Sequence, residues 1–269
     1  MKKYGVKKSR FTLVELLVAM GIFCLLLMVS MQIFGGAQRL WVSSEQKNNV
    51  FAAARTSMEF VASRIQANAY SEEMPFMLYD KKTVNSVSHY EKIFFPTVMP
   101  MNRKDNSGEE RDKYSLRFAG FLLNEDGVLE MRIFSDEQST NYLRYLPPYR
   151  RGKSPDYNTA RTYIKEKIEN PGSGKEHNKI EIAEFVTSFR LIPYNTNSAD
   201  AKEPVSKDTS SGEHWTPPYL LEIEISMLDT RANYSKWKTA SADEKKEIEQ
   251  ESGYTFRRAV LLGDRRNRE

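Results

Sequence analysis

The sequence predicts an α+β protein with one membrane-spanning helix, and three observations predict this fold. The stretch Phe11–Phe34, 24 residues long, is almost entirely apolar. The next segment repeats apolar residues at the spacing of one helix face. Later segments alternate apolar and polar residues as strands do, most clearly in Leu221–Ile225, where two glutamates separate three apolar side chains. Such alternation is typical of an antiparallel sheet with one solvent-exposed face.

Residues 1–10 form a basic leader that contains no acidic residue: Lys2, Lys3, Lys7, Lys8 and Arg10. They are five of the 40 basic residues, so the remaining chain has 35 basic against 36 acidic side chains. A nearly neutral body does not predict a nucleic-acid partner.

Residues 11–34 are long enough to cross a bilayer, because about 20 helical residues at 1.5 Å each span the hydrocarbon core. The basic leader places the N-terminus in the cytoplasm and the rest of the chain outside. A cleaved secretory signal is the alternative, but its apolar core has about 7–15 residues and a small-residue cleavage site follows it. Here Gln38–Trp41 follow the apolar run.

Residues 35–72 are expected to continue the helix, because no proline occurs before Pro75. Its apolar face consists of Val50, Phe51, Ala54, Met58, Val61 and Ile65. A continuous helix from Phe11 to about Asn68 would be about 87 Å long, with Gly35-Gly36 as its weakest point. We expect the apolar face to pack on a sheet.

Residues 73–263 are predicted to form a β-rich head with inserted loops. The expected strands are Lys92–Phe95, which ends at Pro96, then Tyr114–Leu123, Val128–Phe134, Ile180–Tyr194, Tyr219–Asp229 and Tyr254–Leu262. Asp126-Gly127 supplies a hairpin turn between the second and third of these strands.

Short helices and polar segments separate the strands. Thr159–Glu169 is a helix candidate, and Asn195–Pro218 has the composition of a loop. Ser241 and Glu244 have the spacing of a capping box, which predicts a polar helix to about Glu251 between the last two strands. Residues 264–269 form a charged tail.

The residue types of catalytic and metal sites do not occur in recognisable patterns. Cys24 is the only cysteine, so an intrachain disulfide is impossible. The three histidines are far apart and lack metal-ligand spacing. Phosphate-binding loops and hydrolase signatures are also missing. We therefore expect no enzymatic activity, no metal and no cofactor.

Glu15 is the unusual residue of the apolar run. A carboxylate costs about 2.5–3.5 kcal/mol at the bilayer centre and less near its edge. Glu15 could lie at the interface and reach water, or it could meet a cation inside an assembly.

The residues Lys8-Ser9-Arg10 followed by Phe11, Thr12, Leu13, Val14, Glu15 and Leu16 resemble the signal of type IV pilins and type II secretion pseudopilins. The resemblance implies that a membrane prepilin peptidase cuts between Arg10 and Phe11 and methylates the new amine of Phe11. It also implies that Glu15 aligns the subunit in a filament by pairing with that amine on a neighbour. The chain departs from the family in having Arg10, where glycine normally precedes the cut.

Segments of the head resemble J-type minor pseudopilins in particular: Leu129–Arg132, Glu184–Leu191, Pro217–Ile223 and Phe256–Val260. The resemblance implies a pilin-like α+β fold and a minor subunit near the tip of a type II secretion pseudopilus. Its partners would be the peptidase, other minor and major pseudopilins and the bacterial inner membrane, with the head in the periplasm. The alternatives are a minor pilin of a type IV pilus and a signal-anchored ligand-binding protein.

Overall fold

The computed structural model describes residues 12–68, 76–84, 87–104, 110–134, 159, 162–163, 166–167, 178–194 and 218–262. The chain divides into two compact units, Met1–Asn49 and Val50–Glu269. The first contains a long helix, and the second contains the end of that helix and an antiparallel sheet. The predicted α+β class is therefore confirmed.

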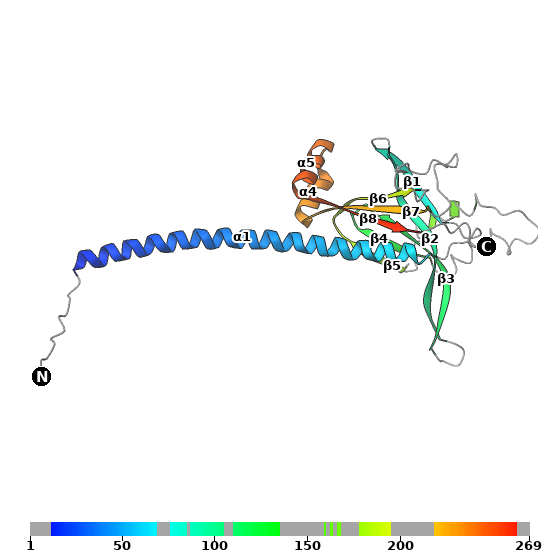
Figure 1. Ribbon diagram of the computed structural model, residues 1–269, viewed down its shortest axis with the longest axis horizontal. Coiled ribbons are helices and arrows are strands. Elements are labelled where there is room, and N and C mark those ends of the chain that lie inside the picture. Colours follow the sequence, from blue (N-terminus) through cyan, green and yellow to red (C-terminus); the bar gives the residue numbers. More distant parts are fainter. Residues whose placement is uncertain are drawn as a thin grey trace, which may run out of the picture. The chain divides into compact units, whose positions relative to one another are not determined.

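Helix α1 extends from Leu13 to Gln66 without interruption (Figure 1). Gly35 and Gly36 lie inside it, so the predicted weak point does not break the helix. Asn68 follows the last turn, and its side-chain amide donates to the carbonyl of Ile65 at 2.6 Å. That bond satisfies one of the carbonyl groups that a helix end leaves without an intrahelical partner.

The sheet has eight antiparallel strands in the order β5-β4-β3-β2-β6-β7-β8, and β1 pairs with β2. The strands are β1 Met77–Val84, β2 Val87–Lys104, β3 Glu110–Leu123, β4 Leu129–Ile133, β5 Asn178–Ala183, β6 Val186–Tyr194, β7 Leu220–Leu228 and β8 Gly253–Leu261. The predicted hairpin is β3 and β4, and Gly127 in its turn has a φ of 72°. Glycine adopts this left-handed conformation without steric cost.

Strand β2 does not end at Pro96, as the sequence predicted, but continues to Lys104. Pro96 is the pairing partner of Phe118 on β3. The Phe118 carbonyl accepts a bond from Phe134 on its other side, so the pair of Pro96 and Phe118 is a non-hydrogen-bonded pair. Pro96 therefore sits where β3 requires no N–H group from it.

The single strand expected over Ile180–Tyr194 is divided into β5 and β6. Phe185 between them has a φ of 60°, which turns the chain from its pairing with β4 to its pairing with β7. Its carbonyl accepts from Leu228, and the following N–H of Val186 donates to Gly127. These two bonds fix the turn between strands that are not neighbours in the sheet.

Two helices connect β7 to β8, α4 Arg231–Thr239 and α5 Ala242–Ser252, and they lie side by side in Figure 1. The capping box of α5 is confirmed: Ser241 donates to Glu244 from both its backbone N–H and its hydroxyl. The sequence analysis missed α4, whose N-cap is Thr230. Of the candidate helix Thr159–Glu169, five residues are described and all are helical.

Several sequence predictions fall outside the described residues. They concern the leader 1–10, Phe11, the segment 69–75, most of the loop Asn195–Pro218 and the tail 264–269.

The last turns of α1 pack on one face of the sheet, as predicted. The buried residues of this helix are Val50, Ala54, Ser57, Met58, Val61, Ala62 and Ile65. Phe51 is the exception on the predicted face, because it is 50 % exposed. Its ring still contacts Tyr254 and Phe256 of β8, each at 5.3 Å between ring centroids.

The opposite face of the sheet is not uniformly solvent-exposed, so the prediction of one wet face is wrong. Tyr79, Phe94, Phe118 and Phe134 are all buried there. The rings of Phe94 and Phe118 stack at 5.1 Å, and Phe134 packs against Phe94 at 5.5 Å. Aromatic side chains at alternate positions of neighbouring strands bury one another.

Replacing Ile65 with alanine should destabilise the head. Ile65 is completely buried in the core between α1 and the sheet, and a large-to-small change there lowers the free energy of unfolding by about 2–5 kcal/mol. Urea unfolding of the full chain in detergent micelles, followed by intrinsic fluorescence, measures the change. Ala52→Ser on the exposed face is the control, with an expected loss of about 0.5 kcal/mol. Equal losses in the two variants would contradict the packing.

Candidate membrane anchor and assembly site

The first two thirds of α1 are exposed with respect to the described residues. Every residue from Thr12 to Asn49 is exposed, including the large apolar side chains of Leu13, 79 % exposed, and Phe34, 72 % exposed. Within the described part of the chain, α1 is the one helix long and apolar enough to cross a membrane. Exposed apolar surface on this scale is unfavourable in water and favourable in lipid.

The exposed apolar surface extends beyond the predicted span. Leu40 and Trp41 are both about three-quarters exposed, and they follow Arg39. Tryptophan is enriched where a spanning helix leaves the hydrocarbon and enters the headgroup region. The sequence analysis did not single out Trp41, although an aromatic residue some seven positions after the apolar run is a recognisable signal.

Glu15 belongs to a capping box at the start of α1. The backbone N–H of Thr12 donates to Glu15 Oε2 at 2.9 Å, and the Thr12 hydroxyl donates to the same oxygen at 3.0 Å. In return, the Glu15 N–H donates to the Thr12 hydroxyl oxygen at 3.3 Å. The carboxylate therefore satisfies the N–H of Thr12 just before the first helical turn, and it lies at the positive end of the helix dipole.

The sequence analysis missed this local role, although Thr-x-x-Glu before an apolar run is its signature. Both bonds from Thr12 use Oε2. No bond to Oε1 occurs among the described residues, so this oxygen can accept another donor. Arg10 and Phe11, which flank the expected cut, lie outside the described residues. The structure therefore does not test the expected ion pair between the Phe11 amine and Glu15 of a neighbour.

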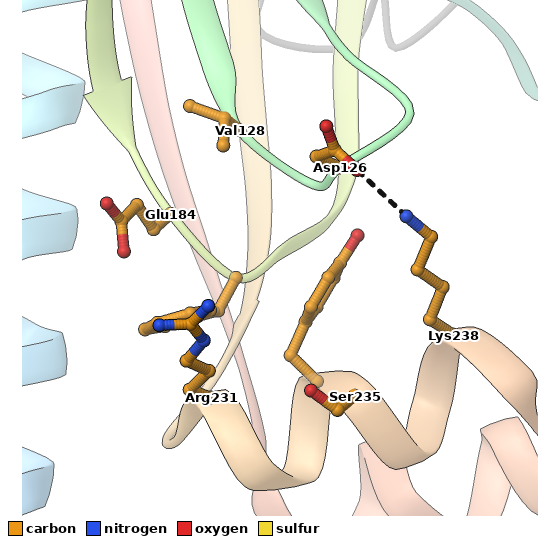
Figure 2. Close-up of a pocket in the computed structure, with 8 residues that line it drawn as sticks. Asp126, Val128, Glu184, Arg231, Ser235 and Lys238 are labelled. Carbon is orange, nitrogen blue, oxygen red and sulfur yellow. Dashed lines mark hydrogen bonds and ion pairs between the residues drawn. The ribbon is translucent and has the colours of Figure 1, made fainter.

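The head contains a cavity of about 390 Å³ between the β3–β4 turn, the β5–β6 turn and α4. It is lined by Asp126, Val128, Glu184, Phe185, Arg231, Tyr234, Ser235 and Lys238. Figure 2 shows the Asp126 carboxylate and the Lys238 ammonium group pointing toward one another, and they are 2.9 Å apart. Their pairing lowers the pKa of Asp126 and raises the pKa of Lys238.

The wall of this cavity requires Gly127. A Cβ atom at that position would lie 2.1 Å from the Tyr234 hydroxyl oxygen, and the positive φ disfavours other residues as well. Tyr234 also packs on Phe185 at 6.1 Å and on Trp237 at 5.8 Å. The aromatic contacts explain the position of α4 beside the two turns.

The cavity lacks a catalytic constellation among its lining residues. The lining set contains no histidine that could activate Ser235. In the described ranges, no cluster of three His, Cys, Asp or Glu side chains could hold a metal ion. Charges of both signs line the cavity: Asp126 and Glu184 are acidic, and Arg231 and Lys238 are basic.

A buried carboxylate joins the three last strands of the sheet. Glu224 of β7 is 3 % exposed, although its alternation with apolar residues predicted a solvent-exposed face. Arg190 of β6 donates to Oε1 at 3.0 Å, and Arg257 of β8 donates to Oε2 at 2.7 Å. Each carboxylate oxygen has an arginine partner, so burial is compensated and the cluster is structural.

Glu222 lies beside this cluster and accepts a bond from the Tyr194 hydroxyl at 3.0 Å. Burial of the phenol and its hydrogen bond to Glu222 raise the pKa of Tyr194 to about 12. The neutral phenol is thus favoured in the folded chain.

Comparison with protein-family models gives no match to this chain, and a search of curated proteins finds no match either.

The contribution of Tyr194 to stability should disappear at alkaline pH. Its folded pKa of about 12 is higher than the unfolded value near 10. The contribution is therefore complete below pH 10 and is lost as the pH rises through 12. Subtracting the unfolding free energy of Tyr194→Phe from that of the parent between pH 8 and 12 isolates this residue. A difference that stays constant over that range would contradict the raised pKa.

Proposed function

We propose that this chain is a minor pseudopilin-like structural subunit of a type II secretion system, anchored in the bacterial inner membrane and assembled near the tip of a pseudopilus. One observation carries the proposal. A single helix is exposed and apolar over its first part, is buried against an antiparallel sheet over its last turns, and has a carboxylate in its first turn. A membrane anchor alone would need this carboxylate only as a helix cap.

Processing by a prepilin peptidase gives this carboxylate a partner. A cut between Arg10 and Phe11 removes the basic leader and creates an α-amino group four residues before Glu15. Methylation of that amine keeps its positive charge. The resemblance of Phe11–Leu16 to the prepilin signal supports this step.

Pairing with the amine of a neighbouring subunit would fix the axial register of the filament. Opposite charges about 4 Å apart attract strongly where the dielectric constant is low, although the loss of hydration offsets much of the gain. Glu15 Oε1 suits this role because the cap engages Oε2. One carboxylate can hold the helix start and accept a neighbour's ammonium group.

The orientation in the membrane follows from the leader. Five basic residues precede the apolar run, so the N-terminus stays in the cytoplasm and the head reaches the periplasm. The protein then acts as the substrate of an enzyme rather than as an enzyme.

Two alternatives make different demands on these residues. A minor pilin of a type IV pilus would use the same helix. In that case formation of a pilus would depend on the chain, whereas for a pseudopilin the secretion of a cargo protein would depend on it. A signal-anchored ligand-binding protein would keep residues 1–10 and need Glu15 only as a cap. The cavity beside α4 and the capping box favour this second alternative.

The processed form should begin at N-methylated Phe11. Intact mass and N-terminal sequencing of the protein extracted from its native membrane measure this directly. Such a result would also show that the peptidase accepts Arg10 before the cut. A chain that still begins at Met1 would mean a permanent signal anchor and would favour the ligand-binding alternative.

Substitutions at Glu15 and Thr12 should separate the assembly role from the cap. Glu15→Gln retains a cap acceptor, because glutamine also completes a capping box, but it removes the charge. We expect Glu15→Gln and Glu15→Ala to abolish recovery of other prepilin-like subunits with this chain from solubilised membranes. Mass spectrometry of the co-purified proteins measures the recovery.

Thr12→Ala is the matched control for these variants. It removes the cap hydroxyl, at a cost of about 0.5–2 kcal/mol in helix stability, and keeps the Glu15 charge. Subunit recovery should persist in this variant. Normal recovery with Glu15→Gln and reduced recovery with Thr12→Ala would show that the cap, not the charge, matters, and the filament role of Glu15 would be rejected.

A further inference from the structure

Strand β8 is the terminal strand of the sheet, and its outer edge is open. It pairs with β7 over nine consecutive positions, from Leu220 opposite Leu261 to Leu228 opposite Gly253, without a register shift. Within the described residues, no strand pairs with its other side. A long, regular edge strand presents unpaired N–H and C=O groups to its surroundings.

The hydrogen bonds at both ends of β8 identify the outward groups. Leu262 donates its N–H to Tyr219, and Ser252 accepts from Asp229. Even-numbered positions of β8 therefore bond to β7, because alternate residues of an antiparallel strand face alternate sides. The N–H and C=O groups of Thr255, Arg257, Ala259 and Leu261 point away from the sheet. The side chains of these four residues are exposed as well.

Strand β5, at the opposite end of the strand order from β8, is protected. It has six residues, and its pairing with β4 shifts register between Leu129 and Glu130. At this bulge the Ser57 hydroxyl of α1 donates to the Ile182 carbonyl at 3.0 Å. A bulge and a covering helix are two of the devices that block pairing with another chain. Strand β8 has neither a bulge nor a proline.

The charge of β8 selects the kind of strand that could pair with it. Arg257 and Arg258 are its only charged residues, with side chains 66 % and 45 % exposed. Arginines at an edge also discourage aggregation, and they disfavour pairing of β8 with β8 of a second copy, because like charges would meet. Acidic side chains opposite them would be favourable. Leu261, at the end of the edge, is 55 % exposed and offers an apolar contact.

We propose that the outer edge of β8 binds an extended, acidic segment of another protein by β-strand addition. Backbone bonds to the outward groups of Thr255, Arg257, Ala259 and Leu261 would supply the pairing. Carboxylates facing Arg257 and Arg258 would supply the selectivity. This inference does not rest on the filament proposal, because no residue of the membrane segment takes part.

Ala259→Pro tests the edge without removing a bond inside the sheet. The Ala259 N–H faces away from β7, so proline there removes only an outward donor. Ala259→Thr is the matched control, since it keeps the N–H and a strand-favouring residue. The probe is a synthetic nine-residue peptide that contains three glutamates and otherwise alternates threonine and valine. A second peptide carries lysine at the three glutamate positions. Both are titrated by fluorescence anisotropy into the full chain in detergent micelles.

We expect the glutamate peptide to bind the parent and Ala259→Thr with equal affinity. Its affinity for Ala259→Pro should be at least about tenfold lower, because proline removes the outward N–H and its ring clashes with the incoming strand. Amide exchange by NMR gives an independent readout. The peptide should slow exchange at Thr255, Arg257, Ala259 and Leu261, whereas the amides that already bond to β7 should not change.

Three results would overturn the proposal. Equal binding of the lysine peptide would remove the acidic selectivity. Equal binding by Ala259→Pro, with a far-UV spectrum like that of the parent, would exclude the edge. A loss of self-association in Ala259→Pro without peptide, measured by sedimentation, would show that a second copy occupies the edge. If Ala259→Pro fails to fold, the exchange pattern of the parent decides alone, and uniform or absent protection would reject strand addition.

Discussion

The burial of one face of α1 against the sheet is the interaction on which the rest of the structure depends. Ala54, Val61 and Ile65 have no exposed surface, and they fix the last turns of a helix whose earlier residues, Thr12 to Asn49, are exposed among the described residues. Helix propagation adds one hydrogen bond for each residue that is ordered, whereas nucleation is unfavourable. A packed end therefore provides the nucleus from which the exposed part can continue. Gly35 and Gly36 weaken the helix by about 1 kcal/mol each, yet α1 continues through both of them.

The capping box changes the interpretation of Glu15. A carboxylate in an apolar run that lacked a local partner would by itself suggest an assembly role, but Thr12 is a local partner of Glu15 here. The two roles are nevertheless compatible because the bonds from Thr12 converge on one oxygen. The cap also restricts the side-chain rotamer of Glu15. A restricted side chain loses less conformational entropy when it accepts a second donor, so the cap would prepare the carboxylate for a neighbouring amine.

Local signals predicted the elements that depend on local chemistry. The long apolar helix, the Asp126-Gly127 turn and the Ser241 capping box were all predicted, because their residue types act within a few positions. Strand β1 was missed because Asp80, Lys81 and Lys82 interrupt its apolar residues, and Asp80 adopts a φ of 60°. It pairs with the next strand, β2, from Val84 opposite Val87 onward, so the missing signal is the polar content of the strand itself. The break at Phe185 depends on bonds to Gly127 and Leu228, which are distant in sequence. The burial of Glu224 likewise depends on arginines from two other strands, so alternation alone could not predict it.

The free energies of backbone pairing explain why the charge of β8 contributes more to the proposed binding than its open edge does. A backbone hydrogen bond contributes a net of about 0.5–1.5 kcal/mol, while ordering one residue of an incoming segment costs about 1–2 kcal/mol. Backbone pairing by itself therefore does not bind a short flexible strand.

Strand β8 loses little conformational entropy on binding such a strand, because β8 is already ordered by β7 and because Glu224 holds the Arg257 guanidinium group at 2.7 Å. The rest of the binding free energy must therefore come from side-chain contacts. Arg257 shares Glu224 with Arg190, whereas the one ion pair of Arg258 with a described residue is a long contact of 3.9 Å to Glu59. Arg258 is thus the more available cation. A carboxylate opposite Arg258 would make β8 bind an acidic strand more tightly than a neutral or basic one.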